Sequence, residues 1–306
     1  MKKEISRKFC VAPMMGYTTP YARKLYRILS NNSFLFSEMI ATKSLIYSKS
    51  RENIIDNDSN NPVALQVGGF EVKDLTKASK IAIDYNYDEI NLNVGCPSKA
   101  VQKGSFGACL MRDKILVRNC IEALQNDKIE ATLKCRLGLG KELNYEFFEE
   151  FIDEISKTGI KIIYVHARNA ILNGISPQAN RTIPPLSYDF VKKIKNKYPN
   201  ISFILNGGID NLDKAESLLK EFDGVMVGRL IKNNPFILNQ AQLFSDTIEE
   251  KVPYDIDQQV AMVYQTALTR PPTEAEAEVG RQLIEQGSLD DLTHVVFNLS
   301  EFLYRR

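Results

Sequence analysis

The chain has 306 residues, and its 39 basic and 38 acidic side chains leave a formal net charge of +1. This balance excludes an arginine-rich binding tail, so any site for a polyanion must be local. The 44% apolar and 25% charged residues are typical of a soluble globular protein. No apolar run reaches the length of a signal peptide or a membrane span, so we expect a cytoplasmic protein without a membrane segment.

The cysteine and histidine content limits which metal sites and disulfides this protein could form. The five cysteines contain no Cys-x-x-Cys pair, and the chain has only two histidines. These features argue against a zinc site, an iron–sulfur cluster and a disulfide framework. We therefore expect no metal.

Short β-rich runs alternate with longer helical patterns over the first two-thirds of the chain. Helical patterns cover Val72 to Tyr85, Leu143 to Lys157 and Leu212 to Phe222. Eight such units in about 240 residues predict an α/β fold, a closed (β/α)8 TIM barrel with a short C-terminal helical segment. The eight predicted strands are Phe9 to Pro13, Phe34 to Glu38, Pro62 to Val67, Asp88 to Asn93, Ala131 to Arg136, Lys161 to His166, Ile201 to Asn206 and Asp223 to Gly228.

Composition changes near residue 252. From Val252 to Arg306 there is no lysine, and four arginines stand against nine acidic residues. The segment nevertheless reads as helical, with an amphipathic stretch over Ile256 to Leu268, a capping-box pattern at Thr273 and Glu276, a stop at Gly287 and a cap at Ser288 for a helix over Leu289 to Leu303. We expect a barrel over 1–250 and a short acidic helical tail over 251–306, which is either a separate module or the product of a recombined reading frame.

Glycines end the seventh and eighth predicted strands, at Asn206-Gly207-Gly208 and Gly228-Arg229. Loops at these positions of a barrel commonly present backbone N–H groups to a phosphate, and Arg229 adds a charge-assisted donor. The chain has neither a dinucleotide-binding glycine pattern nor a P-loop. A mononucleotide is therefore the ligand that these ends favour.

Lys134 lies in an otherwise apolar strand, where a lysine either points outward or serves a site. If the mononucleotide is FMN, a lysine beside the pyrimidine edge of the flavin would stabilise the anion that forms on reduction. Gln66 and His166 suit hydrogen bonds to flavin edges or phosphate. A single histidine is more often structural, but His166 ends a strand two residues before Arg168.

Cys96 stands in a Gly-Cys-Pro-Ser turn that follows a strand. A lone cysteine is usually a small buried apolar residue. In this turn, however, a thiol that is mostly protonated at pH 7 is suited to give a proton to a carbanion-like centre. The other four cysteines lack this setting, and we expect them to be structural.

Several segments together resemble the tRNA-dihydrouridine synthases, and most closely the bacterial A-type subfamily, over about residues 9–239. They are Ala12 to Met15, Asn91 to Ser98 (NLNVGCPS), Val101 to Met111 (VQKGSFGACLM), His166 to Arg168, Ser176 to Pro185 (SPQANRTIPP), Asn206 to Gly208 and Asp223 to Arg229 (DGVMVGR). The tail departs from the family, whose helical domain has a basic stretch with a tryptophan, because this chain has no tryptophan. From this departure we expect weakened tRNA binding, whereas flavin binding should survive it.

The resemblance implies an FMN enzyme that uses NAD(P)H to reduce a D-loop uridine of tRNA, around position 20, to 5,6-dihydrouridine. Cys96 matches the proton donor, Asn93 a position near the substrate base, and Ala179 and Thr182 a loop that helps to select the nucleotide. The positions that match FMN contacts are Pro13, Met14, Gln66, Lys134, His166, Asn206, Gly207, Gly208, Gly228 and Arg229.

Four cations are expected around the mouth of the site, either holding tRNA phosphates or standing as solvated surface charges. They are Lys99, Lys103, Arg168 and Arg181. Two other functions remain open. The chain could be an FMN-dependent barrel reductase of a free pyrimidine or another small molecule, which needs no basic rim, or a catalytically silent RNA-binding barrel.

Overall fold

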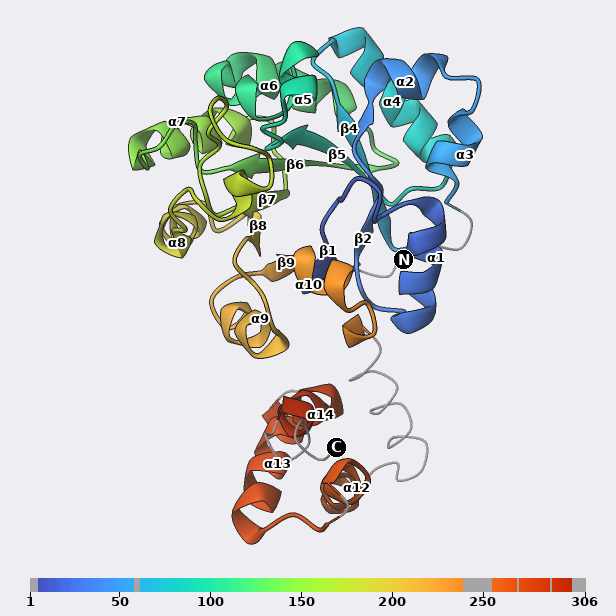
Figure 1. The fold of residues 1–306 in the computed structure, drawn as a ribbon, viewed down its shortest axis with the longest axis vertical. Helices are drawn as coiled ribbons and strands as arrows, with labels where there is room; N and C mark the ends of the chain where they lie inside the picture. Colours follow the sequence, from blue (N-terminus) through green and yellow to red (C-terminus); the bar gives the residue numbers. More distant parts are fainter. Residues whose placement is uncertain (1–4, 58–60, 239–254, 269, 287, 299–306) are drawn as a thin grey trace.

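The computed structural model describes residues 5–57, 61–238, 255–268, 270–286 and 288–298 (Figure 1). Strands and helices alternate over the first two of these ranges, and the helices lie outside the strands. The strands are β1 Phe9–Val11, β2 Leu35–Phe36, β3 Ile40–Ala41, β4 Val63–Gly68, β5 Glu89–Val94, β6 Glu130–Arg136, β7 Ile162–His166, β8 Ser202–Asn206 and β9 Gly224–Val227. The α-helices up to residue 238 are α1 Pro20–Leu29, α2 Thr42–Tyr47, α3 Arg51–Ile55, α4 Val72–Asp84, α5 Lys99–Lys103, α6 Lys114–Leu124, α7 Tyr145–Ser156, α8 Tyr188–Lys197, α9 Leu212–Leu219 and α10 Arg229–Asn233, with 3-10 turns η1 Gly107–Arg112 and η2 Ala179–Arg181.

All the strand pairings are parallel, in the order β1-β9-β8-β7-β6-β5-β4-β2. The ring closes where the backbone N–H of Val11 donates to the carbonyl of Phe34 at 2.8 Å, next to β2. Strands β2 and β3 both pair with β4, so together they occupy one position of the barrel. The predicted (β/α)8 barrel is confirmed, and each of the eight predicted runs overlaps a strand, with β4, β5 and β6 extending one residue beyond their runs.

Local sequence explains where the helices begin. Side chains of Thr19, Ser98, Asp113, Asn144 and Asn211 each accept a hydrogen bond from a backbone N–H in the first turn of a helix. These are the residue types that satisfy the free donors at a helix start. The helices observed as α4, α7 and α9 lie within the three segments predicted to be helical.

The interior of the barrel is divided between apolar and polar side chains. Phe34, Phe36, Tyr164 and Met226 belong to an apolar cluster inside the ring. A row of polar side chains fills the adjoining part, and these residues are at most 8% exposed: Gln66, Glu89, Asn91, Asn93 and Thr132. Because buried polar groups need partners, this part of the interior must be hydrogen-bonded internally.

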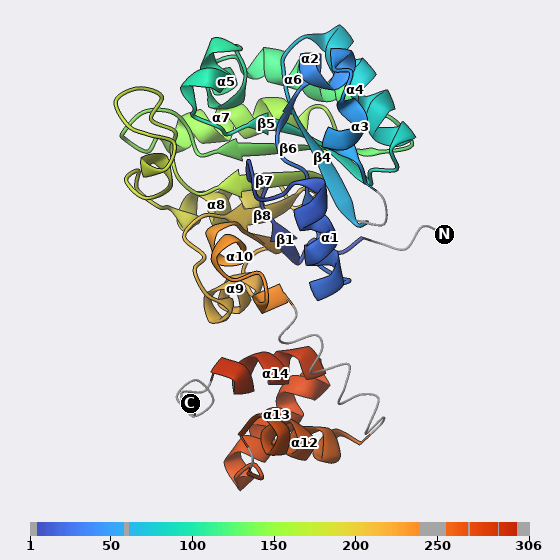
Figure 2. The ribbon, with the colours of Figure 1, turned by 45° about the vertical axis from the view of Figure 1, so that its right-hand side comes forward.

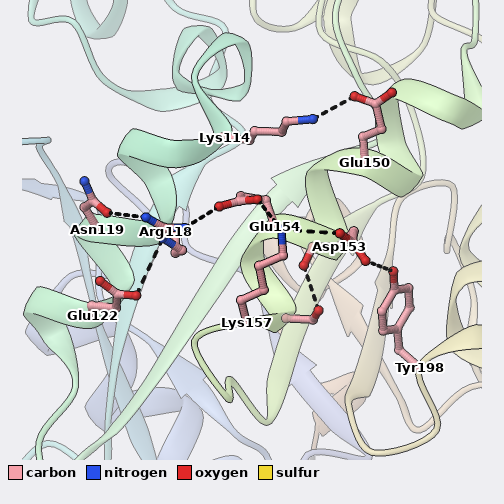
Figure 3. A network of polar contacts seen from close by, with 10 residues as sticks. Lys114, Arg118, Asn119, Glu122, Glu150, Asp153, Glu154, Lys157 and Tyr198 are labelled. Carbon is pink, nitrogen blue, oxygen red and sulfur yellow. Dashed lines mark hydrogen bonds and ion pairs between the residues drawn. The ribbon is translucent and has the colours of Figure 1, made fainter.

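Ion pairs connect the outer helices α6 and α7 (Figure 3). Lys114 pairs with Glu150 at 2.7 Å, and Arg118 pairs with Glu154 at 2.6 Å. Lys157 also reaches Glu154 at 2.6 Å. The Lys114–Glu150 pair is exposed and stabilises the fold only slightly, whereas Glu154 is 8% exposed and is held by both of its cations.

Three helices follow in the C-terminal part, namely α12 Ile256–Leu268, α13 Glu274–Gln286 and α14 Leu289–Asn298. The three helices pack on one another (Figure 2). Buried Val260, Val263 and Leu292 belong to the apolar cluster that they share. The capping box is confirmed, because the N–H of Thr273 donates to Glu276 at 2.7 Å and the N–H of Glu276 donates to the Thr273 hydroxyl at 3.3 Å. The Ser288 cap is also confirmed. The predicted stop at Gly287 and positions 299–303 of the last predicted helix lie outside the described residues.

Within the described ranges, no helix has the length and apolarity needed to cross a membrane. The same residues contain no group of three or more His, Cys, Asp or Glu side chains placed to hold a metal ion.

Candidate active site

A cavity of about 470 Å³ opens at the carboxyl ends of the barrel strands. Its volume falls within the range of small-molecule sites, and this end of a barrel is where enzymes of the fold place their chemistry. Thirteen of the residues singled out from the sequence line it. They are Pro13, Met14, Gln66, Asn93, Cys96, Lys134, His166, Arg181, Asn206, Gly207, Gly208, Gly228 and Arg229.

Five other candidates do not line this cavity. Lys99 and Lys103 are exposed on α5, and Ala179 and Thr182 lie in or beside η2. Arg168 donates to the backbone carbonyls of Thr182 and Pro184. Its guanidinium therefore holds the loop that carries Thr182, and its predicted contact with a phosphate stays a prediction.

The charge of the cavity contrasts with the near-neutral chain. The cations that line it are Lys134, Arg136, Arg181, Arg229 and Lys232, and no Asp or Glu is among the described residues of its wall. Walls of one charge concentrate the electrostatic field and attract ligands of opposite charge. The cavity is therefore suited to an anionic ligand.

Lys134 and His166 lie on neighbouring strands of the cavity wall. The Lys134 ammonium donates to the side-chain oxygen of Asn206 at 3.0 Å, and burial followed by the nearby Arg136 lowers its pKa to about 7. Burial, reinforced by Arg136 and Lys134, also lowers the pKa of His166 well below its usual range, so the imidazole is neutral. Its Nε2 is buried without a protein partner in the described structure.

Gly207 keeps the space beside His166 open. Its φ of +108° lies in the region that favours glycine, and a Cβ built on it would come within 2.7 Å of Cδ2 of His166. Gly208, with a φ of +69°, continues this conformation. The end of β8 therefore brings bare backbone close to the imidazole.

Three hydrogen bonds fix the turn that carries Cys96. The side-chain oxygen of Asn93 accepts hydrogen bonds from the backbone N–H groups of Gly95 at 3.1 Å and Cys96 at 3.0 Å. The N–H of Ala108 donates to the Cys96 carbonyl at 2.9 Å. Gly107 makes this approach feasible, because a Cβ on it would lie 2.6 Å from that carbonyl oxygen.

Arg136 is a buried residue of this site that the sequence reasoning did not assign. Its Nε donates to the Gly95 carbonyl at 2.9 Å, and its Nη1 donates to the carbonyls of Asn169 and Asn180, also at 2.9 Å. It thereby ties the Cys96 turn to the loops after β7. Its place at the carboxyl end of a predicted strand was a signal, but its partners are separated from it by 33 to 44 residues.

A closed parallel barrel with a cationic cavity at its strand ends is the architecture of a barrel enzyme that acts on an anionic ligand. The family model described as "Dihydrouridine synthase (Dus)" matches residues 10–283, and the chain belongs to this family. The match continues into α13, beyond the segment over which the resemblance is visible in the sequence.

Similar proteins include the "tRNA-dihydrouridine(20/20a) synthase" of Xylella fastidiosa (strain Temecula1), which is 46% identical over 244 residues, covering 78% of this chain and 73% of the relative. The protein of the same name in Escherichia coli (strain K12) is 43% identical over 235 residues, covering 76% and 68%. Among solved structures, morphinone reductase in complex with tetrahydroNAD superposes with a TM-score of 0.50 at 12% identity, over 73% of this chain and 83% of that one. This last likeness concerns the fold alone.

Proposed function

We propose that this protein reduces a D-loop uridine of tRNA, around position 20, to 5,6-dihydrouridine, with FMN as bound cofactor and NAD(P)H as electron donor. Membership of the dihydrouridine synthase family supports this activity, as do the names of the similar proteins. The observation that carries the proposal is the cavity itself, which combines a thiol, a neutral imidazole and five cations with no carboxylate in its described wall.

The residues present fit a flavin mononucleotide. The unpartnered Nε2 of His166 offers a buried polar atom to a ligand, and the bare backbone at Gly207 and Gly208 leaves room beside it. Arg229 and the glycines suit the phosphate, and Lys134 suits an anionic edge of the ring. When bound, the flavin supplies the hydride that adds to C6 of uracil.

Cys96 supplies the matching proton. Hydride addition at C6 places an electron pair on C5, the Cys96 thiol gives its proton to C5, and solvent water then reprotonates the thiolate. The C5=C6 double bond becomes a single bond, which consumes one hydride and one proton. Asn93 accepts from the backbone N–H of Cys96 and lines the same cavity, which supports a role for Asn93 near the substrate base.

A uridine in a folded tRNA must leave its stack before it can enter this cavity. Extruding a base from a loop costs a few kcal/mol, less than from a duplex. Arg181 and Lys232 line the cavity, where they are suited to hold phosphates beside the extruded nucleotide. We assign nucleotide selection to the loop with Ala179 and Thr182, which Arg168 holds in place.

The division of the chain into domains and its localisation are also proposals. We propose that residues 1–250 form the catalytic barrel and that 251–306 form a short acidic helical tail, in a cytoplasmic protein. Since the tail is acidic, tRNA binding rests on the barrel cations, and we expect few phosphate contacts.

The test is flavin oxidation in a single turnover. Purified protein is reconstituted with FMN, reduced with NADPH, and mixed with unmodified tRNA or with free uridine. Rapid reoxidation with tRNA and slow reoxidation with uridine supports the proposal. Equal rates would favour a small-molecule reductase, and failure to retain FMN would eliminate both enzymatic functions. Dihydrouridine mapping in tRNA from cells with and without the protein identifies the position.

A further inference from the structure

A buried carboxylate lies at the amino end of the barrel interior, far along β5 from the cavity. Glu89 is fully buried, and its carboxylate accepts hydrogen bonds from Nε of Arg7 at 2.9 Å, the hydroxyl of Thr132 at 2.6 Å and the hydroxyl of Tyr164 at 3.1 Å. Burial raises the pKa of Glu89, while Arg7 and the two hydroxyl groups favour the carboxylate. The amino end of the barrel interior therefore holds a carboxylate that is paired with Arg7 and accepts from two hydroxyl groups.

From Glu89 a continuous chain of hydrogen bonds leads to the Cys96 turn. Nδ2 of Asn91 donates to the hydroxyl oxygen of Thr132 at 2.8 Å, and Nε2 of Gln66 donates to Oδ1 of Asn91 at 2.8 Å. Nδ2 of Asn93 then donates to Oε1 of Gln66 at 2.8 Å. The free Oδ1 of Asn93 accepts from the N–H groups of Gly95 and Cys96.

All the hydrogen bonds in this chain run in one donor-to-acceptor direction. The groups at both of its ends require that direction. A carboxylate only accepts, so the Thr132 hydroxyl must donate to Glu89 and accept from Asn91. Each amide then has its oxygen toward the cavity end and its NH2 group toward Glu89. At the far end, backbone N–H groups only donate, so they require the oxygen of Asn93. Reversal of one amide would bring donor against donor at one of its links and acceptor against acceptor at the other.

We propose that Glu89 is a positioning residue that sets the direction of this chain and thereby fixes the amides of Gln66 and Asn93 and the backbone of Cys96. Successive hydrogen bonds of one direction polarise one another, and in a buried setting each is costly to leave unpaired. The consequence for catalysis rests on the proposed function, since Gln66, Asn93 and Cys96 all line the cavity. The orientation itself does not depend on any substrate.

Glu89→Gln replaces the acceptor that faces Thr132 by a donor, with almost no change in the shape of the side chain. The amide oxygen of the new side chain turns to Arg7, which only donates, so its NH2 group faces Thr132. The proton of the Thr132 hydroxyl, displaced from position 89, keeps an acceptor only if the hydroxyl donates to Asn91, and the amides then flip in turn. At the end of the chain, the NH2 group of Asn93 would face the N–H groups of Gly95 and Cys96, and those hydrogen bonds would be lost.

The test is amide hydrogen exchange, measured by NMR on the protein without tRNA or added NADPH. In Glu89→Gln we expect exchange at Gly95 and Cys96 to accelerate by about tenfold or more, as for loss of one hydrogen bond. Thr132→Val, which breaks the chain without disturbing the Arg7 pair, should do the same. Thr132→Ser keeps the hydroxyl and should restore the parent rates.

Two controls separate positioning from general loosening. Glu130 pairs in register with Glu89 on the neighbouring strand but is not part of the chain, so Glu130→Gln should leave both rates within about twofold of the parent. The amides of Val165 and Leu205, on β7 and β8, serve as internal references. The proposal is overturned if folded Glu89→Gln or Thr132→Val leaves exchange at Gly95 and Cys96 unchanged, if Thr132→Ser accelerates it equally, or if the reference amides accelerate to the same extent. Should Glu89→Gln fail to fold, the comparison of Thr132→Val with Thr132→Ser tests the proposal. None of these outcomes depends on tRNA reduction, so failure here is distinguishable from failure of the proposed function.

Discussion

The Nε atom of Arg136 and the backbone carbonyl of Gly95 lie 2.9 Å apart, and this hydrogen bond ties the end of β6 to the residue before Cys96. Arg136 is 3% exposed, and burial lowers its pKa to about 10, so it stays charged at neutral pH. One guanidinium thus holds two loops of the cavity region, the Cys96 turn and the connection between β7 and α8.

Replacing Arg136 should therefore destabilise the fold. Arg136→Met leaves the carbonyls of Gly95, Asn169 and Asn180 without their donor, and we expect the free energy of unfolding to fall by about 2–4 kcal/mol. Urea unfolding measures the loss. Arg112→Met, at an exposed position of η1, should stay within about 0.5 kcal/mol of the parent, and similar losses in both variants would contradict this role.

Cys96→Ala should separate the two halves of the reaction. The variant is expected to retain FMN and to be reduced by NADPH, but to lose at least ~10²-fold in the rate of tRNA reduction, because the proton donor is gone. Stopped-flow absorbance of the flavin follows both steps. Cys120→Ala, on α6 and outside the cavity, should react at close to the parent rate. An undiminished rate in Cys96→Ala would remove the thiol from the mechanism.

The lowered pKa of Lys134 predicts a pH-dependent stability. Below pH 7 the lysine is charged in both the folded and the unfolded chain, and its burial is then most costly. As pH rises from about 7 towards its ordinary pKa of 10.5, the folded chain loses the proton first, so stability increases. Lys134→Met removes this titration.

We therefore expect Lys134→Met to stabilise the protein, relative to the parent, by about 2 kcal/mol more at pH 6 than at pH 9. Urea unfolding of both proteins at the two pH values gives the difference. Lys80→Met, at an exposed position of α4, should show no such change. If parent and Lys134→Met differ in free energy of unfolding by the same amount at both pH values, burial does not lower the pKa of Lys134.

Arg181 should contribute to tRNA affinity through phosphate. Arg181→Gln is expected to weaken binding uniformly across tRNA sequences and to reduce the slope of log K against log salt by about one. Filter binding between about 50 and 200 mM salt measures the slope. Lys80→Gln, on the outer face of the barrel, should leave it unchanged. If Arg181→Gln retains the full slope, this arginine makes no phosphate contact.

The sequence by itself determined the barrel and most of the cavity wall. Strand and helix periodicity are local properties, and parallel strands in a closed ring bring their carboxyl ends together, so residues as distant as Pro13 and Arg229 are expected at one face. The structure places both in the same cavity. The capping box at Thr273 was also readable, since its partners are three residues apart.

The tertiary structure decided what depends on register and on long-range contact. Strand β3 is two residues long and forms only by pairing with β4, so no local pattern marks it. The role of Arg136 and the turning of Arg168 toward a loop depend on carbonyls brought close by other elements. The hydrogen-bond chain from Glu89 requires Asn91 to lie opposite Thr132 across two strands, and a shift of one residue would turn these side chains to opposite faces of the sheet.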